Sequence, residues 1–352
     1  MRVMVAPDSF GETLTANAAA GAIARGWSAA RPEDDVISAP QSDGGPGFVD
    51  VLATRLGSVQ RCEVEGPLGE TITSKWLLDG RTAYIEAAAA CGLHLLGRSP
   101  TTSTALSATS RGVGQLIAAA IEADVDTVYV GLGGSSCSDG GRGMVDGLGG
   151  LTAAVRRLGR VRLIAATDVE NPLLGEHGAA YVYGPQKGAD AAVVELLDRL
   201  NRDWATVLQV ETGLDVSDMP GAGAAGGIGA ALFALGGRME SGASVVAEVT
   251  DQANALRSVD LVLTGEGKFD SQSLRGKLVT RVAAAGAKSG VETIVLAGQV
   301  HLGREQLASA GITSAYSIAE FAGSVERAMS DAGRQLQLLA QHAGDEFTRR
   351  QA

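Results

Sequence analysis

Acidic and amide side chains recur in this sequence at the points where short apolar segments stop. They stand among glycine and proline residues and comprise Asp8, Asp43, Asp139, Asp168 with Asn171, and Glu266 with Asp270. One such turn means little, because Asp and Gly are ordinary turn formers. Five of them at the ends of predicted strands indicate a shared site, since α/β proteins bind ligands at the carboxyl ends of their strands. Carboxylates gathered there could accept a proton or bind a metal ion.

A glycine-rich segment from 131 to 143 follows the predicted strand Thr127–Val130, and six of its thirteen residues are glycine. Glycine lets backbone N–H groups approach an anion closely, and serine hydroxyls add further donors. Such donors beside a carboxylate favour phosphoryl transfer. No Gly-x-x-x-x-Gly-Lys-Ser/Thr motif is present, which excludes a P-loop. The candidate phosphate-binding residues of this segment are Gly133, Gly134, Ser135, Ser136, Ser138 and Asp139.

Lysine is scarce, because only five of the 29 lysine and arginine residues are lysine. Lys187, Lys268 and Lys277 nevertheless lie close to glycines in motif-like segments. A genome that favours arginine codons explains the totals but not these positions. We expect Lys187 and Lys277 to neutralise an anion, and Lys277 lies near the start of the predicted helix Arg275–Ser289, where the helix dipole also favours one.

A parallel sheet is needed to bring these loops together. Alternating strand and helix patterns at both ends of the chain predict one. Its predicted elements are strands Met1–Ala6, Val36–Ala39, Leu261–Thr264, Thr293–Ala297 and Ala315–Ile318, with helices Thr15–Ala30 and Phe48–Leu56.

The middle of the chain has a different character. Segments Ile72–Leu78 and Thr82–Glu86 predict a hairpin, with Asp79-Gly80 suited to a type I′ turn. A start at 221–229 rich in glycine and alanine could bind phosphate at a helix N-terminus or allow close helix packing. Further predicted elements are helix Thr104–Ala123, strands Arg162–Ala166 and Tyr181–Tyr183, and helix Asp190–Val210.

These patterns predict an α/β protein with two domains. Both chain ends, 1–62 and 256–352, would form a Rossmann-like domain with a parallel sheet. Residues 63–255 would form a second, inserted α/β domain.

Composition excludes several classes of partner. The net charge of −11 and pI near 4.9 argue against nucleic-acid binding through a basic face. No segment approaches the ~20 apolar residues of a membrane span. The cysteines Cys62, Cys91 and Cys137 lack metal-like spacing and suggest a reducing compartment. We expect a soluble cytoplasmic protein that binds small molecules, as a monomer or a homodimer.

Several blocks together resemble the two-domain bacterial glycerate kinase family, which lacks a P-loop. The resemblance spans nearly the whole chain, from Ala6 to Gly298. In chain order the blocks are Ala6-Pro7-Asp8-Ser9-Phe10, Ser42-Asp43-Gly44-Gly45, Gly133-Gly134-Ser135-Ser136 with Ser138-Asp139-Gly140-Gly141, Thr167-Asp168-Val169 with Asn171, Gly184-Pro185-Gln186-Lys187-Gly188, Gly221–Gly227, and Gly265-Glu266-Gly267-Lys268 with Asp270, Gly276 and Lys277.

The resemblance implies ATP-dependent phosphorylation of D-glycerate with Mg²⁺, with 2-phosphoglycerate favoured, in a cleft between the two domains. Asp43 is then the first candidate for the base that accepts the hydroxyl proton. Asp168 is a second candidate for the base or a metal carboxylate, or simply the N-cap of a turn. Glu266 and Asp270 are candidates for Mg²⁺. Lys187 and Lys277 would neutralise phosphate or glycerate, and the substrate contacts would include Asp8, Ser9, Gly44, Gly45, Asn171 and the residues of the glycine-rich segment.

Two segments depart from the family pattern. The family usually has Phe-Lys-Gly-Ser-Leu where this chain has Phe10-Gly11-Glu12-Thr13-Leu14. It usually has Ala, Glu and Thr where this chain has Ser42, Pro46 and Phe48. The departures leave two alternatives open, namely a kinase of another small hydroxy acid and a non-catalytic nucleotide or metabolite sensor.

Overall fold

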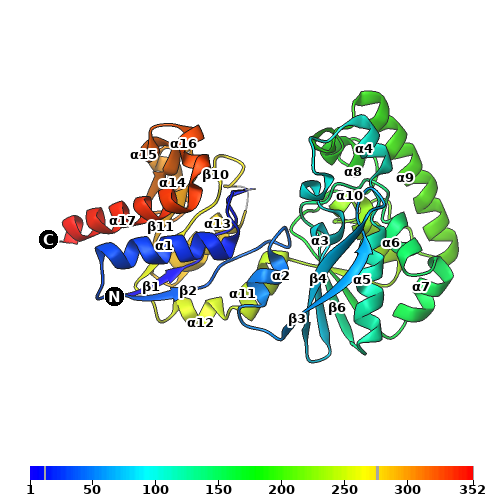
Figure 1. The fold of residues 1–352 in the computed structure, drawn as a ribbon, viewed down its shortest axis with the longest axis horizontal. Helices are drawn as coiled ribbons and strands as arrows, with labels where there is room; N and C mark the ends of the chain where they lie inside the picture. Colours follow the sequence, from blue (N-terminus) through cyan, green and yellow to red (C-terminus); the bar gives the residue numbers. More distant parts are fainter. Residues whose placement is uncertain (12, 275–276, 352) are drawn as a thin grey trace. The chain divides into compact units, whose positions relative to one another are not determined.

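The computed structural model describes residues 1–11, 13–274 and 277–351. The chain forms two compact units, each with its own sheet (Figure 1). Residues 1–42 and 246–352 form the first unit, and residues 43–245, inserted between them, form the second. The expected α/β class with parallel strands is confirmed.

The first unit contains a five-stranded sheet with the order β13-β11-β9-β1-β2, in which every neighbouring pair is parallel. Its strands are β1 (Arg2–Val5), β2 (Asp35–Ser38), β9 (Leu261–Thr264), β11 (Glu292–Ala297) and β13 (Ser314–Ser317). A separate parallel pair is formed by β10 (Lys268–Phe269) and β12 (Gln299–Val300).

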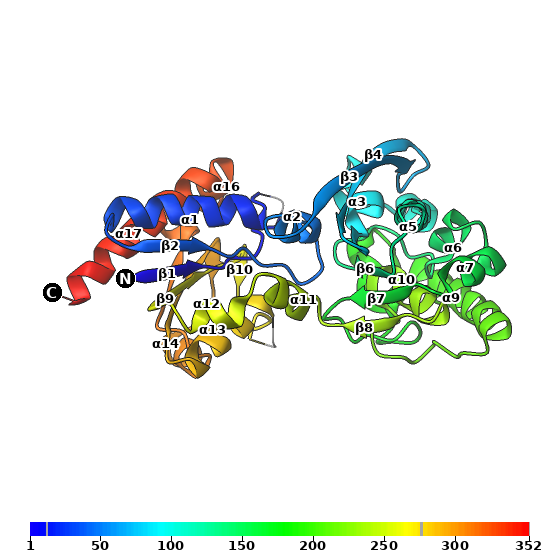
Figure 2. The same ribbon diagram turned by 90° about the horizontal axis from the view of Figure 1, so that it is seen from below.

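Helices cover both faces of this sheet (Figure 2). Along β1, Val3 and Val5 pack with α1 and α17, whereas Met4 packs on the opposite face with residues of α12 and α13. This division follows from the alternation of side chains along a strand. The helices of the unit are α1 (Ala16–Ala30), α12 (Gln252–Leu256), α13 (Leu278–Lys288), α14 (Arg304–Ser309), α15 (Ile318–Ala322), α16 (Val325–Ser330) and α17 (Ala332–Gln351).

The second unit contains a six-stranded mixed sheet with the order β3-β4-β5-β6-β7-β8. The β3–β4 and β4–β5 pairs are antiparallel, and the remaining pairs are parallel. Its strands are β3 (Ser58–Glu65), β4 (Thr71–Asp79), β5 (Thr82–Glu86), β6 (Thr127–Gly131), β7 (Arg162–Ala166) and β8 (Arg238–Glu240). One continuous core packs this sheet against its helices.

The helices of the second unit are mostly short, apart from α5 and the long α9. They are α2 (Phe48–Leu52), α3 (Ala88–Cys91), α4 (Thr102–Ser107), α5 (Arg111–Glu122), α6 (Arg142–Gly147), α7 (Leu151–Leu158), α8 (Ala179–Tyr183), α9 (Ala191–Thr212) and α10 (Ala224–Ala234), with 3₁₀ turns η1 (Leu93–Leu96) and η2 (Pro185–Lys187). Helix α11 (Gly242–Val249) carries the chain across the boundary between the units. No helix within 1–11, 13–274 and 277–351 has the length and apolarity needed to span a bilayer.

The unit boundaries lie at 42/43 and 245/246, whereas the sequence suggested 62/63 and 255/256. Packing explains the difference at the first boundary. Phe48 is fully buried beside Tyr84 of the second unit, and β3 pairs along its whole length with β4. Residues 43–62 therefore belong with the sheet that follows them.

Three local predictions are wrong. Tyr181–Tyr183 is the end of helix α8 and not a strand. The predicted helix Thr104–Ala123 is two helices, α4 and α5, because Ser110 between them bonds to Asp139 and to the N–H of Met144. The hairpin turn is centred on Gly80-Arg81, since Asp79 pairs with Thr82.

Only Gly80 of that hairpin turn has a positive φ, of 55°. A type I′ turn needs a positive φ at both central residues, so this turn matches type II′ instead. The start of the predicted helix Arg275–Ser289 lies outside the described residues, as does Glu12; from Leu278 onward the helix is confirmed as α13.

Candidate active site

In the first unit, the loops that follow β1, β9 and β11 lie at one edge of the sheet. The Asp8 N–H donates to the Gly265 carbonyl at 2.8 Å, and the Gly298 N–H donates to the Glu266 carbonyl at 3.0 Å. Parallel strands place their carboxyl ends at the same edge, which is why residues 257 positions apart in the chain share a loop cluster. Asp8, Ser9 and Glu266 are thereby brought together, and all three are half-buried.

The carboxylate of Asp270 is occupied by its own loop. Its Oδ1 accepts from the Gln272 N–H at 2.8 Å, and its Oδ2 lies 3.1 Å from Lys268 Nζ. The hydrogen bond from Gln272 and the neighbouring ammonium of Lys268 lower the pKa of Asp270. Lys277 is exposed at the N-cap of α13. Both oxygens of the Asp270 carboxylate therefore have partners within its own loop.

In the second unit, two glycine-rich loops meet backbone to backbone: residues 43–47 before α2, and residues 132–141 between β6 and α6. The Gly133 N–H donates to the Gly44 carbonyl at 3.0 Å. Gly44 has a φ of 96°, and a Cβ at this position would collide with the Ala166 carbonyl oxygen at the end of β7. A Cβ on Gly133 would likewise collide with Gly45. Only residues without side chains allow this approach, so the glycines at 44, 45 and 133 set the positions of both loops.

Asp43 and Asp168 join the same cluster in the second unit. Asp43 is exposed, and its Oδ1 accepts from the Gly45 N–H at 3.1 Å. Asp168 is half-buried, and its Oδ2 accepts from the Ala243 N–H at 3.2 Å at the start of α11. A Cβ on Gly242 would collide with the Asp43 carbonyl oxygen, so α11 begins directly against the Asp43 loop.

Lys187 is buried, with 3% of its surface exposed, against the loop of residues 132–141, which we call the glycine–serine loop. Its Nζ donates to Ser135 Oγ at 3.0 Å and to the Cys137 carbonyl at 2.6 Å. Burial lowers the pKa of this lysine. A buried ammonium needs such partners to offset its desolvation, so Lys187 fixes the loop and places Ser135.

Three of the predicted binding residues have their polar atoms occupied by structural contacts. Asp139 accepts from the Ser110 N–H and Oγ and from the N–H groups of Gly141 and Gly143. Ser136 Oγ donates to the Cys91 carbonyl at 2.9 Å. Asn171 accepts from the Tyr183 hydroxyl and donates to the His177 carbonyl. These contacts organise the loops around the cluster.

Glu86 is a positioning residue that the sequence did not single out. Its Oε2, at the end of β5, accepts from the Gly47 N–H at 2.9 Å and from the Val49 N–H at 3.4 Å. Burial raises the pKa of this carboxyl to about 7, and the two backbone hydrogen bonds oppose that rise. Glu86 holds the loop that begins at Asp43. An acidic residue that ends an otherwise apolar strand was the available signal.

The segment 221–229 serves packing. A Cβ on Gly226 would collide with the Cys137 carbonyl oxygen, and one on Gly227 would lie 2.5 Å from Gly140 Cα. Residues 225–227 all have positive φ, so the chain turns here and α10 is not regular at its start. Of the two alternatives, close packing accounts for these glycines.

Comparisons with known proteins identify the family of this chain. The family model of the glycerate kinase family matches residues 3–154 and 150–347. The chain belongs to the glycerate kinase family. The expected class of enzyme, a small-molecule kinase acting on an alcohol group, is the class for which that family is named.

Three similar proteins illustrate the range of relatives. An uncharacterised protein of Mycobacterium tuberculosis (strain CDC 1551 / Oshkosh) is 56% identical over 97% of this chain and 90% of its own length. Glycerate 2-kinase of Escherichia coli K12 is 36% identical, and the match covers 94% of both chains. A crystal structure of a protein assigned as glycerate kinase 2 from Salmonella typhimurium LT2 has a TM-score of 0.77 at 32% identity, covering 100% of this chain and 99% of that one.

Proposed function

We propose that this protein is an ATP-dependent glycerate kinase whose favoured product is 2-phosphoglycerate. Membership of the family supports the reaction class, and the name of the Escherichia coli relative supports the 2-position. The observation that carries the assignment is the position of Asp43. It is exposed where its own loop meets the loop after β6 backbone to backbone, and its Oδ1 accepts from the Gly45 N–H.

In the proposed reaction, a hydroxyl oxygen of glycerate attacks the γ-phosphorus of ATP, and ADP leaves with the electrons of the broken P–O bond. Asp43 accepts the hydroxyl proton, and Asp168 is the second candidate for this role. Backbone N–H groups of the glycine–serine loop and the Ser135 hydroxyl would stabilise charge on the transferring group. Lys277 would neutralise phosphate, and Lys187 would act by holding Ser135 in place.

Mg²⁺ usually binds through one or two carboxylates together with substrate phosphates and water. The residues present fit that mode, since Glu266 is a half-buried carboxylate in the loop cluster that also holds Asp8. Glu266 is the carboxylate that would hold the ion in our proposal, because both oxygens of Asp270 already have partners. When bound, the ion would neutralise charge on the phosphates.

The assignment is tested by coupled measurement of ADP release with D-glycerate, followed by identification of the phosphorylated carbon in the product. Asp43→Asn should lower kcat by about 10²–10⁴-fold if Asp43 is the base. Asp50→Asn is the matched control, because Asp50 lies in α2 directly after the same loop and pairs with Lys75. Equal activity of the two variants would remove Asp43 from the role of base.

A kinase of a different small hydroxy acid is the second candidate, and Pro46 and Phe48 beside Asp43 favour it because they depart from the family pattern. A panel of hydroxy acids in the same assay separates the two. Turnover with another acid and none with D-glycerate would favour the second candidate. ATP binding with no turnover of any acid would favour a non-catalytic sensor. We also propose a cytoplasmic location, supported by three free cysteines.

A further inference from the structure

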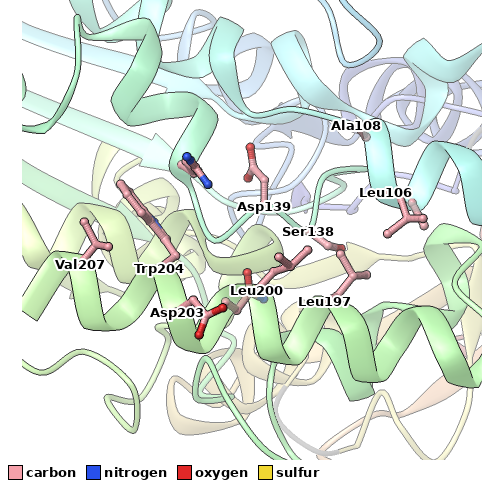
Figure 3. A pocket seen from close by; sticks show the side chains of 12 residues that line it. Leu106, Ala108, Ser138, Asp139, Leu197, Leu200, Asp203, Trp204 and Val207 are labelled. Carbon is pink, nitrogen blue, oxygen red and sulfur yellow. The ribbon is translucent and has the colours of Figure 1, made fainter.

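A cavity of about 420 Å³ lies within the second unit, between α4, α9 and the segment that leads into α6 (Figure 3). This size falls in the range of small-molecule sites. Its walls are mainly apolar and include Leu106, Leu197, Leu200, Trp204 and Val207. Leu106, Leu200 and Val207 are 46%, 50% and 45% exposed, which is unusual for aliphatic side chains gathered around one hollow. The cavity therefore favours a ligand with an apolar body.

Two buried polar groups line the same cavity without partners. Ser138 Oγ and Asn201 Nδ2 have no hydrogen-bond partner among the residues that the structure describes. Ser138 is 2% exposed and Asn201 is 1% exposed. Buried polar groups in native proteins are nearly always hydrogen-bonded, so two unpaired groups on residues that line one cavity favour a ligand that carries polar atoms. An aliphatic chain would leave both atoms unpaired.

Trp204 and Arg142 form one side of the cavity. The indole N–H of Trp204 donates to the Gly140 carbonyl at 3.1 Å, which fixes the ring. The guanidinium carbon of Arg142 lies 5.7 Å from the centre of that ring. Arg142 is exposed, so this cation is available to a negatively charged group at the rim. Asp203 and Asp139 also line the cavity, and both oxygens of Asp139 already accept hydrogen bonds. A ligand with an apolar ring system would match the apolar walls, polar ring atoms would match the two unpaired groups, and an anionic tail would match the Arg142 guanidinium.

We propose that this cavity binds the adenine ring of an adenine nucleotide. One edge of adenine presents a ring-nitrogen acceptor beside an amino donor. The Asn201 amide can donate to the first, and the Ser138 hydroxyl can accept from the second. Ser138 also belongs to the glycine–serine loop, so a nucleotide bound here by its base would lie against the loop to which the proposed function assigns the transferring phosphoryl group. The assignment rests on the proposed use of ATP.

The test is calorimetric titration of the full-length protein with ADP and, separately, with inorganic pyrophosphate, which lacks the base. ADP should bind more tightly than pyrophosphate. Asn201→Leu removes the donor and should weaken ADP binding about 5- to 10-fold. Leu106→Trp places a larger side chain in the cavity and should weaken ADP binding about tenfold or more. The fold should tolerate this change, because Leu106 is 46% exposed. Pyrophosphate binding should stay unchanged in both variants.

Leu214→Trp is the matched control, because Leu214 is 40% exposed and does not line the cavity. It should bind ADP like the wild type. The proposal is overturned if the wild type binds ADP no better than pyrophosphate, or if both cavity variants bind ADP like the wild type.

The KM for ATP in the cavity variants distinguishes a catalytic nucleotide site from a separate effector site. A KM for ATP that rises in parallel with the loss of ADP binding identifies the site as that of the substrate's base. An unchanged KM identifies a separate effector site. Adenine binding that depends on the cavity, in a protein that does not phosphorylate glycerate, would keep this inference and reject the proposed function.

Discussion

Glu86 makes the stability of the second unit depend on pH in a way that one substitution can isolate. Glu86 is 5% exposed, and burial raises the pKa of its carboxyl from 4.5 to about 7. Between these values the unfolded chain has lost the proton and the folded chain keeps it. The folded state then binds more protons, so stability falls as pH rises through this window. The contribution is fully present below pH 4.5 and lost above pH 7.

The size of this effect follows from the pKa difference. Each pH unit between the folded and unfolded pKa is worth about 1.4 kcal/mol, which gives about 3 kcal/mol over the whole window. Most of it, about 2 to 3 kcal/mol, falls between pH 5 and pH 8. Glu86→Gln keeps an oxygen that can accept from Gly47 and Val49 but cannot ionise. The stability of the wild type relative to this variant should therefore fall by that amount from pH 5 to pH 8.

Urea unfolding at several pH values measures the difference, followed by tryptophan fluorescence, since Trp76 and Trp204 both belong to the second unit. Taking wild type minus variant at each pH cancels the titration of all other groups. Glu63→Gln, at an exposed position of β3, is the control and should show no such trend. A Glu86 difference that stays constant within about 0.5 kcal/mol across this range would refute the reasoning.

Three further predictions concern the two loop clusters. Gly44→Ala should destabilise the protein by more than about 1 kcal/mol and abolish activity, because a Cβ at this position would collide with the Ala166 carbonyl oxygen. Gly47 has the same φ of 96° but no atom within 4 Å of such a Cβ, so Gly47→Ala should cost only the backbone strain. Thermal unfolding measures the loss of stability and ADP release measures the loss of activity, and equal losses in the two variants would contradict the argument. Lys187→Met should cost about 1–3 kcal/mol and lower kcat, because it leaves the Cys137 carbonyl without its buried donor, whereas Lys75→Met on β4 should do neither. Glu266→Gln should raise the Mg²⁺ concentration needed for half-maximal activity, whereas Asp270→Asn should change it little; a larger effect at Asp270 would reverse the proposed roles.

The alternation of apolar segments with glycine-containing loops was sufficient to predict the fold class. Runs such as Leu261–Thr264 and Thr127–Val130 are short, apolar and bounded by glycine, which is the pattern of buried parallel strands. Parallel pairing then requires their carboxyl ends to share an edge. For this reason Asp8 and Glu266 could be grouped from the sequence before any contact was known. The contact of Gly44 with Gly133 does not follow from this rule, because their loops follow β2 and β6, which belong to different sheets.

The failures come from contacts between residues distant in the chain. No residue near Ser110 in the sequence predicts the helix break, because its hydrogen-bond partner Asp139 lies 29 residues away. Asp139 also shows which feature of the candidate site could not be predicted from the sequence. Residue type and neighbouring glycines suggested a ligand group at Asp139, and only the four donors around it show an organising role. Glu86 and Asn201 were missed because burial, and not any local motif, makes them unusual.

The loop that carries Asp43 is held by packing at the positions where it departs from the family pattern. Phe48 is fully buried, 6.4 Å from the ring of Tyr84, and a Cβ on Gly131 would lie 3.0 Å from its ring. Pro46 packs so closely on Gly134 that a Cβ there would lie 2.6 Å from its ring. With Glu86 binding the backbone between them, the position of Asp43 does not depend on a charged side chain at 46. The departures therefore change what surrounds the proposed base more than where the base stands, which makes substrate preference, and not loss of catalysis, their expected consequence.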